Sequence, residues 1–186
     1  MTTPIQRVCV YCGSSNGVPK VYLDSASAMG RALASRRLTL VYGGGSTGLM
    51  GALADGALGA GGDVIGVITA HLNTPDLAHA GLTEMRVVES MHARKSAMAQ
   101  MAHVFVALPG GLGTMEELFE VLTWAQIGLH DRPIGLLNVR SYFDPLLSLI
   151  DHARQHGFLH NTDRVRLIAQ SDPDSLLDRL IGGRSV

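Results

Sequence analysis

The sequence alternates, over nearly its whole length, between short apolar runs and segments with helical periodicity. The apolar runs are almost continuous in Val, Ile and Leu, which is typical of strands that are covered on both faces. Regular alternation of this kind predicts a parallel, doubly wound α/β sheet with right-handed crossovers. We therefore expect a Rossmann-like sheet of six or seven strands flanked by helices, in a single domain that spans residues 1–186.

The pattern also predicts where these elements lie. Strands are expected at residues 8–11, 38–42, 63–68, 85–88, 104–108 and 134–137, with a seventh candidate at 165–169. Helices are expected at residues 21–35, 49–60, 91–101, 114–127, 145–155 and 173–180. The longest connection without a strand pattern, residues 69–81, is polar and could line a site.

Composition excludes several classes of protein. The formal net charge is −1 and no basic run occurs, so a nucleic-acid footprint is absent. No apolar stretch approaches the roughly 20 residues that a membrane span needs, and no signal peptide is evident. Cys9 lies within an apolar run, so the pair Cys9 and Cys12 is expected to be buried and reduced, the alternative being a redox motif. These features predict a cytoplasmic protein.

Residues 109–117, Pro-Gly-Gly-Leu-Gly-Thr-Met-Glu-Glu, follow an apolar run and precede an amphipathic helix pattern. This order predicts a strand, a glycine turn and the start of a helix. Unpaired backbone N–H groups and the positive end of the helix dipole then point at one place, which favours the binding of a phosphate group. Glu117 sits one turn inside the same helix. An anion cradle beside a fixed carboxylate indicates chemistry on a phosphorylated molecule.

Three glycine-rich turns follow strands, at residues 12–15, 43–48 and 109–114. In a doubly wound sheet, ligands bind outside the carboxyl ends of the strands. The turns therefore predict a nucleotide or sugar-phosphate pocket that includes Ser14, Gly44 and Gly45, the alternative being three structural corners. Residues 43–48 also spell the dinucleotide fingerprint G-x-G-x-x-G. We disfavour NAD(P), because Asp63 begins the next strand instead of ending it.

Several of these residues also have structural interpretations. Thr114 and Glu117 fit a capping box, in which Glu117 would reach back to the Thr114 N–H. Arg94 and Lys95 could be a solvated pair, although cations near a helix N-terminus oppose the dipole and hint at an anionic partner. The methionines Met91, Met98 and Met101 have helical spacing, which favours the core. His152, His156 and His160 are spaced four apart, but no metal motif accompanies them, so no metal site is expected.

Together, two segments resemble a paired family signature. Residues 109–117 and the preceding Met-His-Ala-Arg-Lys of residues 91–95 are similar to the motifs P-G-G-x-G-T-x-x-E and M-x-x-R-K of the LOG ("Lonely Guy") family. Residues 41–51 and 123–126 look like further family segments, and the resemblance covers about residues 7–180. Members of this family are cytokinin riboside 5′-monophosphate phosphoribohydrolases. They cleave N6-substituted AMP, and often AMP itself, to free base and ribose 5-phosphate.

The resemblance implies roles for individual residues. Arg94 and Glu117 match the catalytic pair, while Lys95 and Thr123 match nucleotide-binding positions. Asp76 stands where the family usually has glutamate, so the base or its N6 substituent could be held differently. The remaining implied binding residues belong to the two signature segments: Met91, Gly110, Gly111, Leu112, Gly113, Thr114, Met115 and Glu116.

The resemblance also implies an enzyme that needs no metal or organic cofactor and forms a homodimer. The older label of lysine decarboxylase has no support, because nothing marks a pyridoxal phosphate site and Lys95 lies in the signature. The amount of apolar surface also agrees with a dimer. One face of the sheet could be too small to bury all the apolar side chains of helix 91–101 together with Leu118, Val121, Leu122 and Ile127. Two alternatives remain open, a non-catalytic nucleotide-binding or carrier module and, less favoured, an NAD(P)-dependent oxidoreductase.

Overall fold

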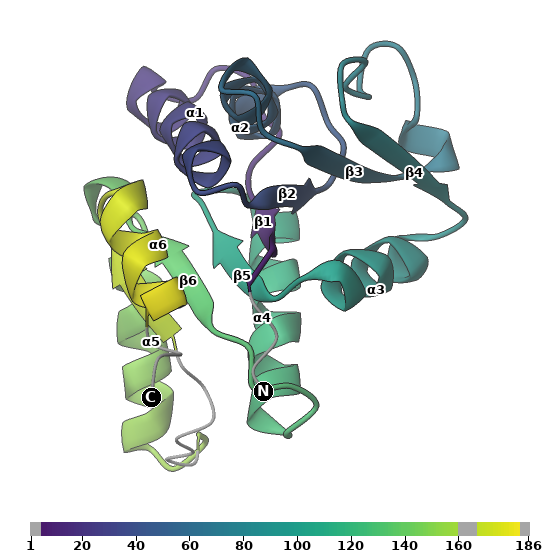
Figure 1. Cartoon of the computed structure of the whole chain (residues 1–186). Helices are drawn as coiled ribbons and strands as arrows, with labels where there is room; N and C mark the ends of the chain where they lie inside the picture. Colours follow the sequence, from purple (N-terminus) through teal and green to yellow (C-terminus); the bar gives the residue numbers. More distant parts are fainter. Residues whose placement is uncertain (1–4, 160–166, 183–186) are drawn as a thin grey trace.

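The structure, a computed structural model, describes residues 5–159 and 167–182, and the strands in this part of the chain form one parallel sheet (Figure 1). The strands are β1 (Arg7–Tyr11), β2 (Thr39–Tyr42), β3 (Val64–Thr69), β4 (Glu84–Val88), β5 (Val104–Ala107), β6 (Ile134–Leu137) and β7 (Leu167–Gln170). The helices are α1 (Lys20–Ser35), α2 (Gly48–Gly59), α3 (Met91–Met101), α4 (Leu112–Gln126), α5 (Asp144–Gln155) and α6 (Pro173–Gly182). Two short 3-10 turns are η1 (Ala70–Leu72) and η2 (Val139–Ser141).

The predicted fold class is confirmed, and all seven expected strands are present. The seventh begins at Leu167, and the first two residues predicted for it, 165 and 166, lie outside the described residues. The largest error at a helix start concerns α4, which begins at Leu112, two residues before the prediction. As a result, Gly111 and not Thr114 is the N-cap of α4.

The strand order is β4-β3-β2-β1-β5-β6-β7. From β1 the chain winds outward through β2, β3 and β4, then returns to pair β5 with the other side of β1. Strands β1 and β5 are thus neighbours whose following segments leave in opposite directions. Such a switch point opens a crevice at the carboxyl ends of the two strands.

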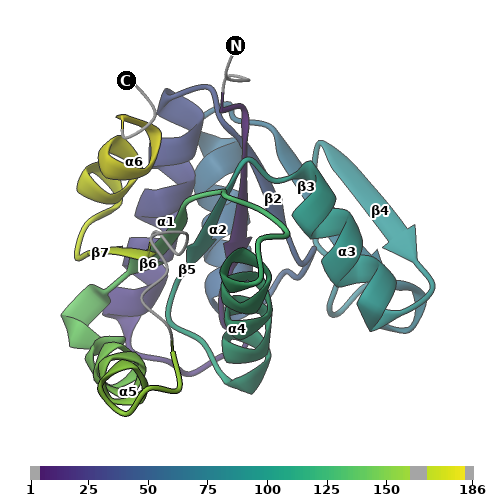
Figure 2. The same ribbon diagram turned by 90° about the horizontal axis from the view of Figure 1, so that it is seen from below.

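Both faces of the sheet are covered (Figure 2). Helices α1, α2 and α6 pack on one face, and α3, α4 and α5 pack on the other. Within β1, Val8 and Val10 join the first core, whereas Cys9 and Tyr11 join the second. This division of alternate side chains between two buried layers explains the near-continuous apolar strands of the sequence.

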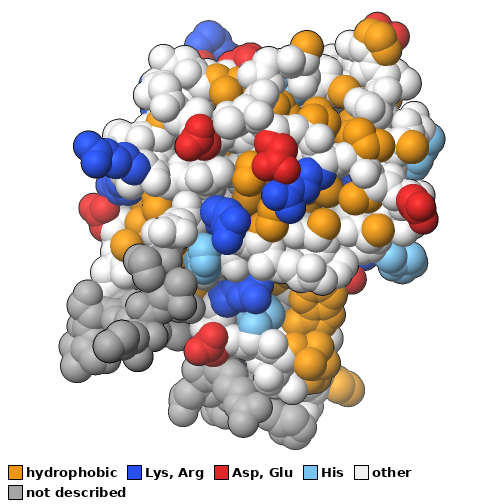
Figure 3. Space-filling view, turned by 45° about the vertical axis from the view of Figure 1, so that its right-hand side comes forward, with side chains coloured by type: hydrophobic (Ala, Val, Ile, Leu, Met, Phe, Trp, Pro, Cys, Tyr) orange, Lys and Arg blue, Asp and Glu red, His pale blue; other side chains and the backbone are white. Residues whose placement is uncertain are grey.

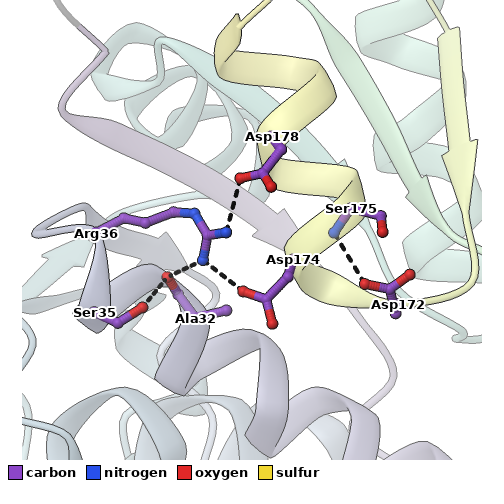
Figure 4. Close-up of polar contacts among 7 residues, drawn as sticks. All are labelled: Ala32, Ser35, Arg36, Asp172, Asp174, Ser175 and Asp178. Atoms are coloured by element: carbon purple, nitrogen blue, oxygen red, sulfur yellow. Dashed lines mark hydrogen bonds and ion pairs between the residues drawn. The ribbon is translucent and has the colours of Figure 1, made fainter.

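The C-terminal helix is fixed to the end of α1 by polar contacts (Figure 4). The Arg36 guanidinium donates to Asp174 at 2.6 Å and to Asp178 at 2.8 Å, one turn apart on α6. The Asp172 carboxylate accepts from the Ser175 N–H at 2.9 Å and caps the start of α6. Because both aspartates that contact Arg36 are exposed, these ion pairs orient α6 more than they stabilise it.

The fold places both cysteines in the core. Cys9 and Cys12 are buried, free thiols, and burial raises the pKa of each well above its ordinary value, as expected for reduced core residues. Among the residues that the structure describes, no group of His, Cys, Asp and Glu could hold a metal ion. His160 lies outside the described residues. No helix in the described ranges is long and apolar enough to cross a membrane.

Candidate active site

A cavity of about 320 Å³ lies at the carboxyl edge of the sheet, at the switch point between β1 and β5. The segments that follow β1, β2, β3 and β5 all contribute to its walls, together with the first turns of α3 and α4. The glycine turns predicted to lie at this edge therefore surround one space. This placement follows from the topology, because parallel strands bring their carboxyl ends together.

Arg94 crosses the floor of this cavity from the first turn of α3. Its Nε donates to the Val67 carbonyl at 2.9 Å, and one terminal nitrogen donates to the Gly43 carbonyl at 3.3 Å. The other terminal nitrogen lies 3.5 Å from a carboxylate oxygen of Glu117. Three anchors hold the guanidinium in one orientation, and the residue is 6% exposed. The interpretation of Arg94 as a solvated surface cation is wrong.

Glu117 faces Arg94 from α4 and is also only 6% exposed. Burial raises the pKa of the Glu117 carboxyl to about 7, against the opposing effect of Arg94. The carboxyl is therefore poised to change charge near neutral pH. A buried, paired carboxylate of this kind in a cavity is typical of a catalytic group.

The capping-box interpretation of Thr114 and Glu117 is wrong. Helix α4 begins at Leu112 with Gly111 as its N-cap, so Thr114 already lies in the first turn. Glu117 points to Arg94 and makes no hydrogen bond to the Thr114 N–H. The sequence concealed this because a glycine can cap a helix with its backbone alone, leaving no side-chain signal.

The turn before α4 is tightly packed. A Cβ on Gly110 would lie 2.1 Å from the Thr114 hydroxyl and 2.8 Å from the Gly13 nitrogen, so only glycine fits there. The Gly13 N–H donates to the Pro109 carbonyl at 3.1 Å, which ties this turn to the end of β1. The first N–H groups of α4 have no partner within the helix, and Gly111, Gly113 and Thr114 at this helix start line the cavity. This is the arrangement that binds phosphates in other folds.

Lys95 does not line the cavity. Its ammonium group pairs with Glu116 and, at 3.1 Å, with Glu120, both on α4. The hydrogen bond to Glu116 is the main cause that raises the pKa of Lys95, against its partial burial. Lys95 thus joins α3 to α4 beside the site, and Glu116 connects it to the cavity wall.

The structure brings together part of the predicted set. The predicted residues that line the cavity are Ser14, Gly45, Met91, Arg94, Gly111, Gly113, Thr114, Glu116 and Glu117. Those that do not line it are Gly44, Asp76, Lys95, Gly110, Leu112, Met115 and Thr123. Met98 and Met101 are buried as expected, but Met91 is 41% exposed at the cavity, so its assignment to the core is wrong.

Five other lining residues belong to the glycine turns that were expected to form the pocket: Cys12, Gly13, Ser15, Gly43 and Thr47. The sequence did not single out four more: Met50, Ile68, Leu72 and Leu77. Leu72 and Leu77 come from the long connection after β3 that was expected to line a site. Gly43 carries the clearest missed signal, because a Cβ there would lie 2.0 Å from the Arg94 guanidinium. The side chain of Arg94 can reach its position only because residue 43 has no side chain.

The raised pKa of Glu117 makes a prediction about stability. The folded carboxyl titrates near 7 and its ordinary value is 4.5, so the folded state holds the proton more tightly. The free energy of unfolding should therefore fall between about pH 4.5 and pH 7, by about 2–3 kcal/mol at 1.36 kcal/mol per pKa unit. Urea unfolding of the natural protein and of Glu117→Gln at pH 5 and pH 8 measures this. Equal pH dependence in both proteins would contradict the prediction.

Comparison with known proteins gives a consistent family. Residues 50–180 match the protein family described as "Possible lysine decarboxylase". A cytokinin riboside 5′-monophosphate phosphoribohydrolase from Rhodococcoides fascians is 51% identical over 168 residues, which cover 90% of this chain and 85% of that protein. A second enzyme of that name from Arabidopsis thaliana is 46% identical over 175 residues, covering 94% and 81%.

Solved structures share the fold at lower identity. The molybdenum cofactor carrier protein of Chlamydomonas reinhardtii is 22% identical with a TM-score of 0.71, and the match covers 96% of this chain and 99% of that one. A molybdenum cofactor binding protein from Rippkaea orientalis is 25% identical with a TM-score of 0.67, covering 96% and 95%. The first of these likenesses supports the architecture alone.

Proposed function

The chain belongs to the LOG family of cytokinin riboside 5′-monophosphate phosphoribohydrolases, and we propose that it hydrolyses AMP and N6-substituted AMP at the N-glycosidic bond. Water is consumed, and the products are the free base and ribose 5-phosphate. The observation that carries this proposal is the buried pair of Arg94 and Glu117 in the cavity, beside the glycine turn that precedes α4.

The cavity has two chemically different ends, which fit the two ends of such a nucleotide. The turn before α4 offers backbone N–H groups, which suit the 5′-phosphate. The walls that follow β2 and β3 are largely apolar, through Met50, Ile68, Leu72 and Leu77. Arg94 bonds to carbonyls of β3 and of the turn after β2, and it meets Glu117 of α4. The pair thus lies between the two ends, where the sugar would sit.

Breaking the glycosidic bond builds positive charge on the ribose. The ionised Glu117 stabilises that charge and can also accept a proton from the attacking water. Arg94 lowers the pKa of Glu117 and so favours its ionised form near neutral pH. Three contacts engage the guanidinium, and its remaining N–H groups are available to the departing base or the ribose. Asp76 does not line the cavity itself, but it precedes Leu77 in the chain, and Leu77 lies at the apolar end, where the base or its N6 substituent would bind.

Lysine decarboxylation has no support in this site. A lysine that forms a Schiff base must be neutral to attack a carbonyl, which requires a lowered pKa. Lys95 instead pairs with two carboxylates, and its pKa is raised, first by the hydrogen bond to Glu116. The other lysine, Lys20, is exposed, pairs with Asp24 and does not line the cavity.

An assay of base release tests the proposal. Isopentenyladenosine monophosphate, AMP, GMP and CMP are incubated separately with the protein, and free base is measured by chromatography. We expect base from the two adenine nucleotides. A nucleotide-binding or carrier module would bind them and release none, and an oxidoreductase would bind NADPH without base release.

Replacing Gly43 by alanine should disable the site by displacing Arg94. The new Cβ would displace the Arg94 guanidinium, which is held at both ends and cannot move aside without losing the Val67 or Glu117 contact. We expect kcat/KM for AMP to fall about 100-fold, as for loss of a positioned catalytic charge. Gly59→Ala is the matched control, because nothing lies within 4 Å of its Cβ position. Equal activity of the two variants would show that Arg94 is not required where it stands.

We also propose that the protein is a homodimer that uses the outer face of α4. Leu118 and Val121, which were expected to be surplus, are fully buried, so that part of the argument is wrong. Other large apolar side chains of this region are exposed instead: Leu112 by 90%, Phe119 by 41%, Ile127 by 62% and Leu129 by 68%. Hydrophobic side chains also gather in a band at the lower right of the face in Figure 3. A second copy would cover such a surface.

The dimer explains the position of Thr123. It lies nine residues beyond Thr114 on α4, about 13 Å along the helix, and is exposed. A contact between Thr123 and the nucleotide would therefore come from the partner subunit.

Light scattering at micromolar concentration should give the mass of two chains, and Phe119→Glu should give the mass of one chain. A monomeric natural protein would contradict the proposal.

We also propose a cytoplasmic location for the protein, and the free, buried thiols of Cys9 and Cys12 support it.

A further inference from the structure

A tyrosine outside the cavity contacts the backbone of the phosphate-binding turn. The Tyr142 hydroxyl donates a hydrogen bond of 2.6 Å to the Gly110 carbonyl. Tyr142 follows η2 and precedes α5, so it approaches the turn from the β6 side of the switch point. It does not line the cavity, whereas Gly111, the residue next to Gly110, does.

The planarity of the peptide bond gives this contact a consequence. The Gly110 carbonyl and the Gly111 N–H belong to one planar trans unit, in which they point in opposite directions. A hydroxyl that holds the carbonyl therefore also fixes the direction of the N–H. Within the described residues, no hydrogen bond is assigned to the Gly111 N–H. Two glycines flanking this unit leave it free to rotate unless something holds it.

The backbone before Tyr142 is itself held in an uncommon conformation. Arg140 and Ser141 both adopt left-handed geometry, with φ of 50° and 58°, although neither is glycine. Such strain persists only where the surroundings determine it. Here the Asn138 side chain accepts from the Phe143 N–H at 2.7 Å and donates to Asp144 at 2.7 Å. The Asn138 N–H donates to the Gln170 carbonyl of β7 at 2.7 Å. This turn places Tyr142.

The rings around Tyr142 complete its support. Tyr22 of α1 packs edge-on against it with 6.0 Å between the ring centroids, and Phe143 packs edge-on at 5.1 Å. The ring position is therefore secured by packing, independently of the hydroxyl. Removal of the hydroxyl alone should leave the ring in place and free the Gly110–Gly111 peptide.

We propose that Tyr142 is a positioning residue that aims the Gly111 N–H at the substrate phosphate by anchoring the Gly110 carbonyl. This inference rests on the proposed function for the identity of the anion. It assigns to Tyr142 an effect on phosphate binding and none on the chemical step. Binding of the phosphate is the same before and during bond cleavage, so its loss raises KM and leaves kcat.

The test compares Tyr142→Phe with Tyr22→Phe, its ring neighbour, whose hydroxyl has no hydrogen bond assigned within the described residues. For Tyr142→Phe we expect the KM for AMP to rise about 3- to 10-fold, the size expected for one hydrogen bond, with kcat within about twofold. Calorimetric Kd for ribose 5-phosphate should rise by the same factor. The slow cleavage of adenosine should be unchanged, because adenosine has no phosphate. Tyr22→Phe should match the natural protein throughout.

The outcomes separate the two proposals. Unchanged KM and Kd in Tyr142→Phe overturn the positioning role, as does an equal loss of activity on adenosine and AMP, which would show a general structural effect. If the natural protein binds ribose 5-phosphate but releases no base, the proposed function fails, and the Kd comparison still decides the role of Tyr142. If ribose 5-phosphate does not bind to the natural protein, the positioning role is overturned.

Discussion

Glu117→Gln is expected to lower kcat/KM for AMP by about 1000-fold while the protein stays folded. Glutamine keeps the shape of the side chain but cannot carry the negative charge that stabilises a positively charged ribose. The structure removes the competing explanation, because Glu117 caps nothing and its carboxylate faces Arg94. Base release by the purified variant, together with its circular dichroism and thermal melting, measures both parts of the prediction.

Glu120→Gln is the matched control for this variant. Glu120 lies one turn further along α4 and pairs with Lys95, which keeps its second partner Glu116. We expect the control to retain most of the activity. The pH profile gives a second check: kcat/KM of the natural protein should rise with pH to a plateau, with a midpoint near the Glu117 pKa of about 7. A Glu117→Gln variant with a normal rate would show that the charge has no role.

Removal of the substrate phosphate is expected to have an effect of similar size. Adenosine should react at least about 1000-fold more slowly than AMP in kcat/KM, since it loses several hydrogen bonds from the α4 turn to a charged group, each worth about 1.5–3 kcal/mol. The phosphate is remote from the bond that breaks, so its binding energy holds the nucleotide in the cavity both before and during bond cleavage and enters kcat/KM in full. Parallel progress curves with the two substrates make the measurement.

Inorganic phosphate and ribose 5-phosphate provide the control for this comparison. Both should inhibit AMP cleavage competitively, because each carries the group that the turn would bind. Adenosine at the same concentration should inhibit weakly. Equal rates on adenosine and AMP, or strong inhibition by adenosine and none by phosphate, would show that the phosphate does not bind at the α4 turn.

The sequence predicted the fold because its signals were local. Periodicity marked every strand in the described part of the chain, and continuous apolar runs indicated two covered faces. The glycine turns were located at the carboxyl edge by topology alone. The capping box was misread for the opposite reason: Gly111 ends the turn with backbone geometry and no side-chain signal. Met91 has core-like spacing, yet it lies at the start of α3, where the helix leaves the sheet and meets the cavity.

The roles of the two adjacent cations could not be separated by sequence either. Arg94 and Lys95 differ by about 100° around α3, and only the packing of that helix decides which of them enters the cavity. Arg94 turns toward the backbone of β3 and Gly43, and Lys95 turns toward the acidic side of α4. The bare backbone at Gly43 that admits Arg94 lies 51 residues away in the chain.

By itself, the sequence determined the parallel sheet, the edge at which the glycine turns meet and the residue types present there, because period, glycine position and helix starts are properties of neighbouring residues. Tertiary structure alone decided which of those residues meet. The pairing of Arg94 with Glu117, the raised pKa of that carboxyl and the hold of Tyr142 on Gly110 all depend on distances between segments far apart in the chain. Burial and direction arise only when helices pack on the sheet, since desolvation and hydrogen-bond geometry are properties of the assembled fold.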